Sequence, residues 1–306
     1  MIRKISLTDL KKAVDGAYEE YKDIKKGEVD PRITNADVKK FGITVMLTDG
    51  TTVSRGDTEV KAPLGDIANV AVHAQLLQQY GVKALIKKAG KTCGHKVRKL
   101  ELPISAHGIR AVSAVEPQND ADGKYEIISS MLMAMLGSEA VLDDKLYETL
   151  AAQVDSEDVV NKLASVDYEV YDDTETSAKM YAKLEALTVD TEQAAAFGAT
   201  MAADGVNPVT KEPAYDAKYA AALTTIAGIN TRPDRLRRWF LKSGVPAVFS
   251  FGGMVVAVMP GLGAIAAYAP EVGKHGRSKK GARAVRYITE AIGYNIFGST
   301  YVEYEK

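Results

Sequence analysis

The sequence predicts an α+β protein, within the broad α/β class, whose sheet is assembled from both ends of the chain. Short β-type runs occur at 41–54 and again at 253–269, whereas the stretch 125–204 is rich in Ala, Leu, Met, Glu and Lys. Those residue types favour helix. Strands at both ends with helices between them indicate a sheet with an inserted helical lobe. We therefore expect a discontinuous sheet lobe of residues 1–65 and 214–306, and a mainly helical lobe of residues 66–213.

The first strand pair is predicted from its turn. Two β-type runs, Phe41–Leu47 and Thr51–Ser54, flank Asp49-Gly50. An Asp-Gly pair between such runs is a strong hairpin signal because both residues readily adopt the positive φ that a tight turn needs.

The second strand pair lies in an uncharged segment. Residues 243–270 contain no Asp, Glu, Lys or Arg, which by length alone is compatible with a transmembrane helix. However, Pro260 and Gly261 divide the segment into two apolar runs, 253–259 and 262–269. Turn residues between two short apolar runs indicate strands. We therefore expect a buried β-hairpin and no membrane partner.

Helices are predicted from apolar spacing. Residues 7–25 carry apolar side chains at helical intervals, and a second amphipathic pattern follows Pro63 and ends at Gly81. The remaining helices are expected at 125–136, 144–153, 157–163, 175–204, 215–227 and 279–292.

Composition excludes several classes of protein and site. The 306 residues include 39 Lys and Arg against 40 Asp and Glu, so no basic excess indicates a nucleic-acid partner. The basic stretch 83–99 has no interleaved aromatic residue and is interpreted as solvated surface. The single Cys93 cannot form an internal disulfide, and no histidines have metal-ligand spacing. We expect no metal or cofactor. The first residues lack a signal-peptide pattern, so a cytoplasmic location is expected.

Four segments carry a resemblance to a known family: AYEEYKDIKKGEV (17–29), FGITVMLTDGTTVSRGD (41–57), FGATMAADGVNPVTKEP (197–213) and GMVVAVMPGLGAIAAYAPEVGKHGRSKKG (253–281). In these segments the chain resembles the bacterial glutaminases, which are relatives of serine β-lactamases and penicillin-binding proteins. The resemblance implies a five-stranded antiparallel sheet flanked by helices, a helical lobe, and a site between the two. It also implies hydrolysis of L-glutamine to glutamate and ammonia, and a homodimer or larger homo-oligomer.

The motif that carries catalysis in that family is altered in this sequence. The family's Ser-Ile-Ser-Lys falls on Asp66-Ile67-Ala68-Asn69, which places Asp66 at the nucleophile and Asn69 at the base. Residues 55–92 contain no serine, so a shift in the alignment does not restore the motif. The family's Lys-Ser-Gly falls on Val248-Phe249-Ser250, which lacks the cation. A serine needs an adjacent base to act as a nucleophile, and both partners are replaced.

The resemblance also implies a set of substrate-binding positions. They are Arg32, Arg110, Tyr181, Asp173, Glu175 and Asn230. Two of these positions carry arginine where the family has tyrosine or asparagine. An arginine fork suits a carboxylate. We therefore expect a small carboxylate-bearing metabolite or amino acid, held by Arg32 and Arg110, with Asp66 as acid or base.

Two histidines are further acid–base candidates. His73 follows Asp66 by seven residues on the predicted helix, and His107 precedes Arg110. Histidine changes charge near neutral pH, which suits proton transfer, although a packed, structural histidine is the alternative interpretation of each. Three alternatives for the whole protein also stay open: residual glutaminase activity through another nucleophile, a non-catalytic ligand-binding protein or pseudoenzyme subunit, and a salt bridge between Asp66 and an arginine that closes an unused site.

Overall fold

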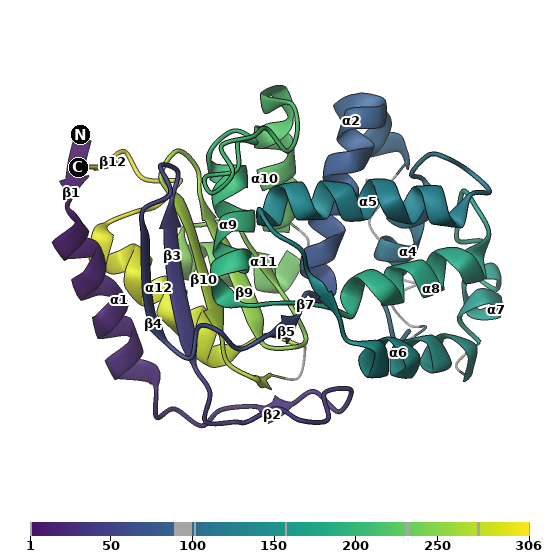
Figure 1. Cartoon of the computed structure of the whole chain (residues 1–306), viewed down its shortest axis with the longest axis horizontal. Coiled ribbons are helices and arrows are strands. Elements are labelled where there is room, and N and C mark those ends of the chain that lie inside the picture. Colours follow the sequence, from purple (N-terminus) through teal and green to yellow (C-terminus); the bar gives the residue numbers. More distant parts are fainter. Residues whose placement is uncertain are drawn as a thin grey trace.

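A five-stranded sheet forms the centre of the molecule (Figure 1). The computed structural model describes residues 2–88, 100, 102–156, 158–229, 233–273 and 276–305. The strand order is β4 (Thr52–Gly56), β3 (Gly42–Leu47), β10 (Gly263–Tyr268), β9 (Met254–Met259) and β8 (Ala247–Phe249). Every neighbouring pair is antiparallel. Both predicted hairpins are therefore confirmed, and strands from the two ends of the chain meet where β3 pairs with β10.

Helices cover both faces of this sheet. Helices α1 (Leu7–Tyr21) and α12 (Lys279–Ile292) pack on one face, and α9 (Thr191–Ala202) packs on the other. In β9 the odd-numbered residues Val255, Ala257 and Met259 face α1 and α12, whereas Met254, Val256 and Val258 face α9. Successive side chains of a strand point to opposite faces, so a sheet covered on both sides needs apolar residues at every position. This explains the uncharged segment 243–270.

The segment 243–270 thus contains strands β8, β9 and β10, and not a transmembrane helix. Within the part of the chain that the structure describes, no helix combines the length and the apolarity that membrane crossing requires.

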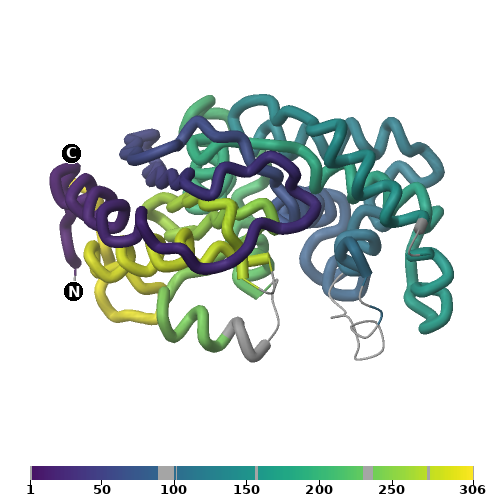
Figure 2. Tube along the Cα trace, turned by 90° about the horizontal axis from the view of Figure 1, so that it is seen from below, coloured from purple at the N-terminus to yellow at the C-terminus, as the bar shows by residue number. Residues whose placement is uncertain are grey.

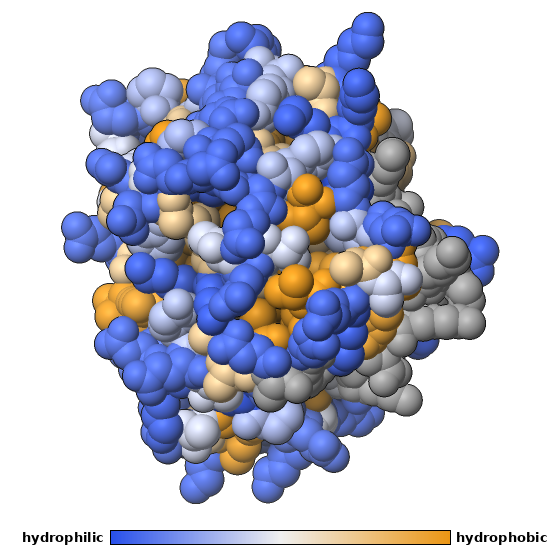
Figure 3. Space-filling view, turned by 90° about the vertical axis from the view of Figure 1, so that its right-hand side faces the viewer, coloured by the Kyte–Doolittle hydropathy of each residue, from blue (hydrophilic) through white to orange (hydrophobic). Residues whose placement is uncertain are grey.

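The helical lobe lies beside the sheet, at the end of the molecule opposite the two termini (Figures 1 and 2). It contains α2 (Ala68–Lys88), α4 (Ala106–Ser113), α5 (Ala121–Leu136), α6 (Asp144–Ser156), α7 (Val159–Ala164) and α8 (Thr174–Glu185). The outer surface of this lobe is mostly hydrophilic, with apolar residues in small groups (Figure 3). The 3₁₀ turn η2 (Ala217–Tyr219) and α10 (Ala220–Ile229) follow α9, and α11 (Pro233–Ser243) precedes β8.

Three short sheets join the ends of these elements. Strand β1 (Ile2–Ile5) pairs in parallel with β12 (Tyr301–Tyr304), so the described ends of the chain lie side by side (Figures 1 and 2). Strand β2 (Glu28–Val29) pairs with β11 (Glu271–Val272). Strand β7 (Leu187–Val189) lies between β5 (Ala62–Pro63) and β6 (Val141–Leu142), which ties the start of the helical lobe to its end.

Two expected helices differ from the structure. The single helix expected over 175–204 is divided into α8 and α9 by β7, because Leu187–Val189 is needed as the middle strand of the small sheet. Gly81 does not end α2; it takes φ +72° inside the helical run, which continues after the kink to Lys88. The part of 175–204 that forms α9 packs on the sheet.

The contact between α9 and the sheet requires a glycine at position 198. A Cβ added to Gly198 would lie 2.6 Å from Ala264 Cβ and 2.7 Å from Val256 Cγ1. We predict that Gly198→Ala lowers the free energy of unfolding by about 1–3 kcal/mol through overpacking, although alanine is the better helix former. Urea unfolding measures this. Glu192→Gln, at an exposed position of the same helix, serves as the control and should change stability by less than about 0.5 kcal/mol. A stabilised Gly198→Ala variant would contradict the prediction.

Candidate functional site

Asp66 lies where the sheet meets the helical lobe. It belongs to the 3₁₀ turn η1 (Gly65–Ile67), which leads into α2 and contacts both β8 and α8. Gly65 has φ +51°, and a Cβ there would lie 2.9 Å from Ser250 Oγ. Ser250 in turn donates a hydrogen bond of 2.5 Å to the carbonyl of Pro63. The turn is therefore fixed against the end of β8, and the Asp66 side chain is exposed.

Tyr181 holds the Asp66 carboxylate. Its hydroxyl donates a hydrogen bond of 3.0 Å to Asp66 Oδ1. Tyr181 comes from α8, is fully buried, and packs on Gly108 of α4, where an added Cβ would lie 2.1 Å from the ring. The ring therefore cannot tilt toward α4. Two helices of the lobe thus fix the direction in which the hydroxyl meets Asp66.

Glu185 is a buried carboxyl that the sequence analysis missed. It is 3% exposed, follows Tyr181 by one helical turn, and its Oε2 has no hydrogen-bond partner among the described residues. Burial raises the pKa of Glu185 well above its ordinary value of 4.5, and the charge of Asp66 raises it further. The spacing of four residues from Tyr181 was the available signal, because residues i and i+4 share a helix face.

Arg32 completes this group of side chains, and three of its five N–H donors bind other protein groups. Its Nε and Nη2 donate to the two carboxylate oxygens of Asp30 at 2.7 and 2.9 Å. Its Nη1 donates to the carbonyl of Pro103 at 3.0 Å, and the guanidinium lies 3.9 Å from the centre of the Phe251 ring. We name Asp30, Arg32, Asp66, Tyr181 and Glu185 the Asp66 cluster.

The surroundings of Asp66 raise the pKa of its carboxyl group. Close packing of protein atoms around Asp66 raises the pKa of its carboxyl above 3.8, although the side chain reaches solvent. The hydrogen bond from Tyr181 and the charges of Arg32 and Arg277 oppose this rise. A carboxylate with a raised pKa is a better proton acceptor than a free one.

Asn69 and His73 lie on the buried side of α2, and His107 of α4 lies next to His73. Asn69 is 1% exposed, and neither polar atom of its side chain has a partner among the described residues. His73 Nδ1 is 2.7 Å from the Asn69 carbonyl, and the His73 and His107 rings are 5.1 Å apart. Burial lowers the pKa of both histidines, that of His107 to about 3, so both are neutral at physiological pH. Neither makes a contact with Asp66.

The structure does not bring Arg110 to Asp66. The Arg110 side chain is 3% exposed and donates to the Lys88 carbonyl at 2.6 Å, to Glu169 Oε2 at 2.7 Å and to the Tyr171 hydroxyl at 3.0 Å. These bonds attach α4 to the end of α2 and to the segment before α8. The expected pair of arginines around one carboxylate is therefore corrected: Arg32 alone is in the Asp66 cluster, because Arg110 is committed to this structural network.

Of three further predicted site residues, Asp173 and Glu175 are separate from the Asp66 cluster, and Asn230 is not among the residues that the structure describes. Asp173 is the N-cap of α8 and accepts a hydrogen bond from the Thr176 amide. Glu175 is exposed and pairs with Lys179 on the same helix. These local contacts lie within α8, and neither carboxylate makes a hydrogen bond or ion pair to a described residue of the Asp66 cluster. Asn230 lies outside the described residues.

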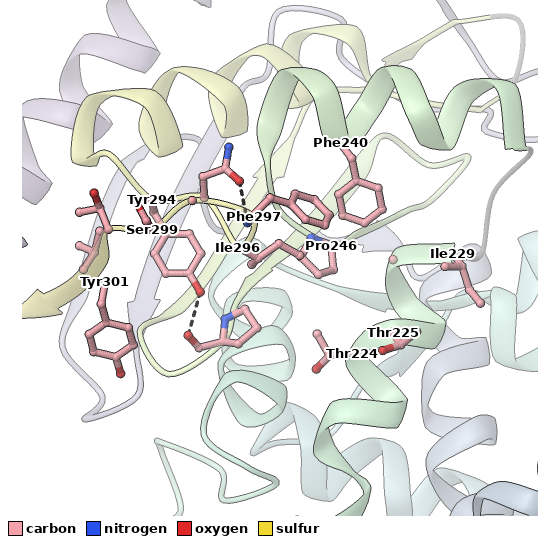
Figure 4. Close-up of a pocket in the computed structure, with 16 residues that line it drawn as sticks. Thr224, Thr225, Ile229, Phe240, Pro246, Tyr294, Ile296, Phe297, Ser299 and Tyr301 are labelled. Atoms are coloured by element: carbon pink, nitrogen blue, oxygen red, sulfur yellow. Dashed lines mark hydrogen bonds between the residues drawn. The ribbon is translucent and has the colours of Figure 1, made fainter. Parts of the chain in front are cut away.

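A cavity of about 580 Å³ lies elsewhere (Figure 4). Phe240, Pro246, Ile296 and Phe297 line it together with residues of α10 and the segment before β12. None of the predicted site residues that the structure describes contributes to its walls, and the described residues around it include no carboxylate, ammonium, guanidinium or imidazole group. Nor do the described residues contain a cluster of three or more His, Cys, Asp or Glu side chains that could hold a metal ion.

Comparison with known proteins matches most of the chain to one family. The family model described as Glutaminase matches residues 27–297. A glutaminase of Parabacteroides distasonis is 29% identical over 315 residues, covering 97% of this chain and 97% of that protein. A glutaminase of Bacteroides thetaiotaomicron is 29% identical over 320 residues, with 99% of each chain covered.

Solved structures confirm the fold. One described as probable glutaminase ybaS has a TM-score of 0.85 and 23% identity, covering 96% of this chain and all of that one. A probable glutaminase from Bacillus subtilis, complexed with 6-diazo-5-oxo-L-norleucine, has a TM-score of 0.78 and 18% identity, covering 95% of this chain and 96% of its own. At these identities the likeness concerns the fold.

The network of Arg110 predicts a contrast between two variants. Arg110→Ala removes three buried or half-buried hydrogen bonds, so the free energy of unfolding should fall by about 3 kcal/mol. Glu169→Gln removes the charge of a partner whose side chain is 54% exposed, so the loss should stay below about 1 kcal/mol. Chemical denaturation measures both. Equal effects of the two variants would contradict a structural role centred on Arg110.

The raised pKa of Asp66 predicts how stability depends on pH. The folded protein favours the protonated acid, so ionisation of Asp66 destabilises the fold above its folded-state pKa. Asp66→Asn should therefore be more stable than the parent at neutral pH, and the difference should disappear as pH falls below the ordinary value of 3.8. Urea unfolding across a pH series measures it.

Asp173→Asn is the matched control with the opposite sign. The bonds from Thr176 lower the pKa of Asp173, so its charge stabilises the fold at neutral pH, and that contribution is lost as pH falls through its folded-state pKa. The variant should be less stable than the parent at pH 7 and equal to it in acid. The same sign for both variants would contradict these assignments.

Proposed function

Because this chain belongs to the glutaminase family, we propose that it acts on a small amino-acid-type substrate at Asp66, by acid–base chemistry of that carboxylate and without serine–lysine catalysis. The family match covers residues 27–297, so the segment around Asp66 lies inside it. No serine occurs between residues 55 and 92. A hydroxyl nucleophile on this turn is therefore absent from the proposed mechanism.

The observation that carries this proposal is the setting of Asp66. Its side chain is exposed, its Oδ1 accepts a hydrogen bond from buried Tyr181, and its turn lies between the sheet and the helical lobe. Its Oδ2 accepts no hydrogen bond from any described residue, so this oxygen is free to take a proton from water or substrate. A positioned carboxylate with a raised pKa suits a general base.

For an amide substrate, the proposed reaction needs no covalent enzyme intermediate. Asp66 accepts a proton from a water molecule while the water oxygen forms a bond to the carbonyl carbon. The carbon–nitrogen bond of the resulting tetrahedral intermediate then breaks, and the proton held by Asp66 passes to the leaving nitrogen. The products are a carboxylic acid and ammonia or an amine. Carboxyl groups perform both proton transfers in other hydrolases.

The contacts of Arg32 narrow the ligand that we propose. Its Nε and Nη2 donate to Asp30 and its Nη1 donates to Pro103, so the protein itself uses most of its hydrogen-bonding capacity. Asn69 follows Asp66 by three residues and offers both a donor and an acceptor that no described residue uses. These properties suit an amide or a zwitterionic amino acid better than a dicarboxylate. A homodimer or larger assembly, and a cytoplasmic location, remain predictions from the sequence.

A second candidate is a protein that binds such a ligand without turnover. The observation in its favour is Asn69, because an amide side chain does not accept a proton at neutral pH. It leaves Asp66 without a titratable partner on the same turn of the helix.

The test is release of ammonia from glutamine, asparagine and other amino-acid amides, together with calorimetric titration of the same compounds. We expect turnover by the parent protein and a fall in kcat of at least about 100-fold in Asp66→Asn, the effect typical of losing a general base. Glu175→Gln, an exposed change on α8, is the matched control and should keep full activity. Turnover that survives Asp66→Asn would overturn the proposed role of Asp66, whereas binding without turnover by the parent would favour the second candidate.

A further inference from the structure

In the Asp66 cluster, the carboxyl groups of Asp66 and Glu185 compete for the single hydroxyl proton of Tyr181. Tyr181 Oη donates a hydrogen bond of 3.0 Å to Asp66 Oδ1, and Glu185, one turn further along the same face of α8, is the second carboxyl group that acts on this hydroxyl. A tyrosine hydroxyl has a single hydrogen to donate. It cannot therefore donate to both carboxyl groups at once.

We propose that Glu185, Tyr181 and Asp66 form a directional hydrogen-bond chain, in which neutral Glu185 donates to Tyr181 and Tyr181 donates to the Asp66 carboxylate. Glu185 is then a positioning residue that acts on Asp66 through Tyr181. The proposal concerns the same site as the proposed function and rests on it for its catalytic consequence.

Exposure decides the direction of the chain. Glu185 is 3% exposed, and its Oε2 has no partner among the described residues, whereas Asp66 is exposed. A buried carboxylate with an unpaired oxygen is far more costly than a buried neutral acid with an unpaired carbonyl oxygen. The proton therefore resides on Glu185, and the negative charge resides at the solvent-facing end of the chain.

The surrounding charges agree with a neutral Glu185. The groups that act on it are Asp66, Arg32, Tyr181 and Asp30, and Arg277 acts on Asp66. Arg32 donates to Asp30 and Pro103, and among the described residues it makes no hydrogen bond to Glu185. With Glu185 neutral, two carboxylates face two guanidinium groups. With Glu185 ionised, a third carboxylate would be buried there and would compete with Asp66 for the single hydroxyl proton of Tyr181.

The chain fixes which oxygen of Asp66 can react. Because Tyr181 occupies Oδ1, the carboxylate is held with Oδ2 free of described donors. A neutral Glu185 also strengthens the bond from Tyr181, because hydrogen bonds in a chain polarise one another. The chain therefore orients the base without adding a second negative charge beside it.

The experiment is a pH titration of the full chain by NMR, with carbon-13 in the side-chain carboxyl groups of aspartate and glutamate. Glu185 should remain protonated at pH 7, and Tyr181→Phe should raise the titration midpoint of Asp66, because the lost hydrogen bond favoured its charged form. Glu175→Gln, at an exposed site on α8, is the matched control and should leave the midpoint of Asp66 unchanged. The proposed hydrogen-bond chain would be overturned if the Glu185 carboxyl is ionised at pH 7. It would also be overturned if Tyr181→Phe leaves the titration midpoint of Asp66 unchanged.

Glu185→Gln and Glu185→Leu separate positioning from packing. The amide of Gln can donate to Tyr181 as the neutral acid does, so Glu185→Gln should keep kcat, while Glu185→Leu should lower kcat about tenfold with KM unchanged, equivalent to one hydrogen bond of about 1.4 kcal/mol. An equal loss of kcat in Glu185→Gln and Glu185→Leu would contradict the proposed hydrogen-bond chain. The NMR titration needs no turnover, so it determines the protonation state of Glu185 even if the protein is inactive. The hydrogen-bond chain and the proposed function can therefore fail independently of each other.

Discussion

The burial of the central sheet on both faces is the constraint on which the rest of the structure depends. Strands β9 and β10 carry apolar residues at every position because α9 covers one face and α1 and α12 cover the other. An ionised side chain at these positions would lose its hydration without gaining a partner. The buried strands therefore carry no ionised side chain, and the Asp66 cluster lies outside them, at the turn and the helix that meet near β8.

At that edge, the hydrogen bond between Tyr181 and Asp66 joins the two parts of the molecule. Asp66 comes from a turn fixed against β8, and Tyr181 comes from a helix of the lobe. The carboxylate thus has a fixed direction although its side chain is exposed, and an exposed but oriented carboxylate is what proton transfer requires. The proposed function, for a chain that belongs to the glutaminase family, uses this oriented carboxylate.

The two arginines Arg32 and Arg110 show that residue type alone does not identify the acceptor that a side chain binds. Arg32 and Arg110 were both expected to bind a carboxylate of a ligand, yet their donors go to Asp30 and Pro103 in one case and to Lys88, Glu169 and Tyr171 in the other. A guanidinium satisfies the nearest acceptors available, whether these belong to a ligand or to the protein. Which acceptors are nearest depends on contacts between residues far apart in the chain.

The sequence by itself determined both hairpins, most helices, the uncharged sheet core and the position of Asp66, because periodicity, turn residues and motif order are local properties. Only the tertiary structure decided that β7 divides the expected helix 175–204, that Arg110 lies in a structural network, and that Glu185 lies beside Tyr181 and Asp66. These outcomes depend on burial and on partners brought together by folding. The sequence does not distinguish a glutamate on an exposed helix face from one buried beside a tyrosine, but the surrounding protein changes the free energy of their ionisation.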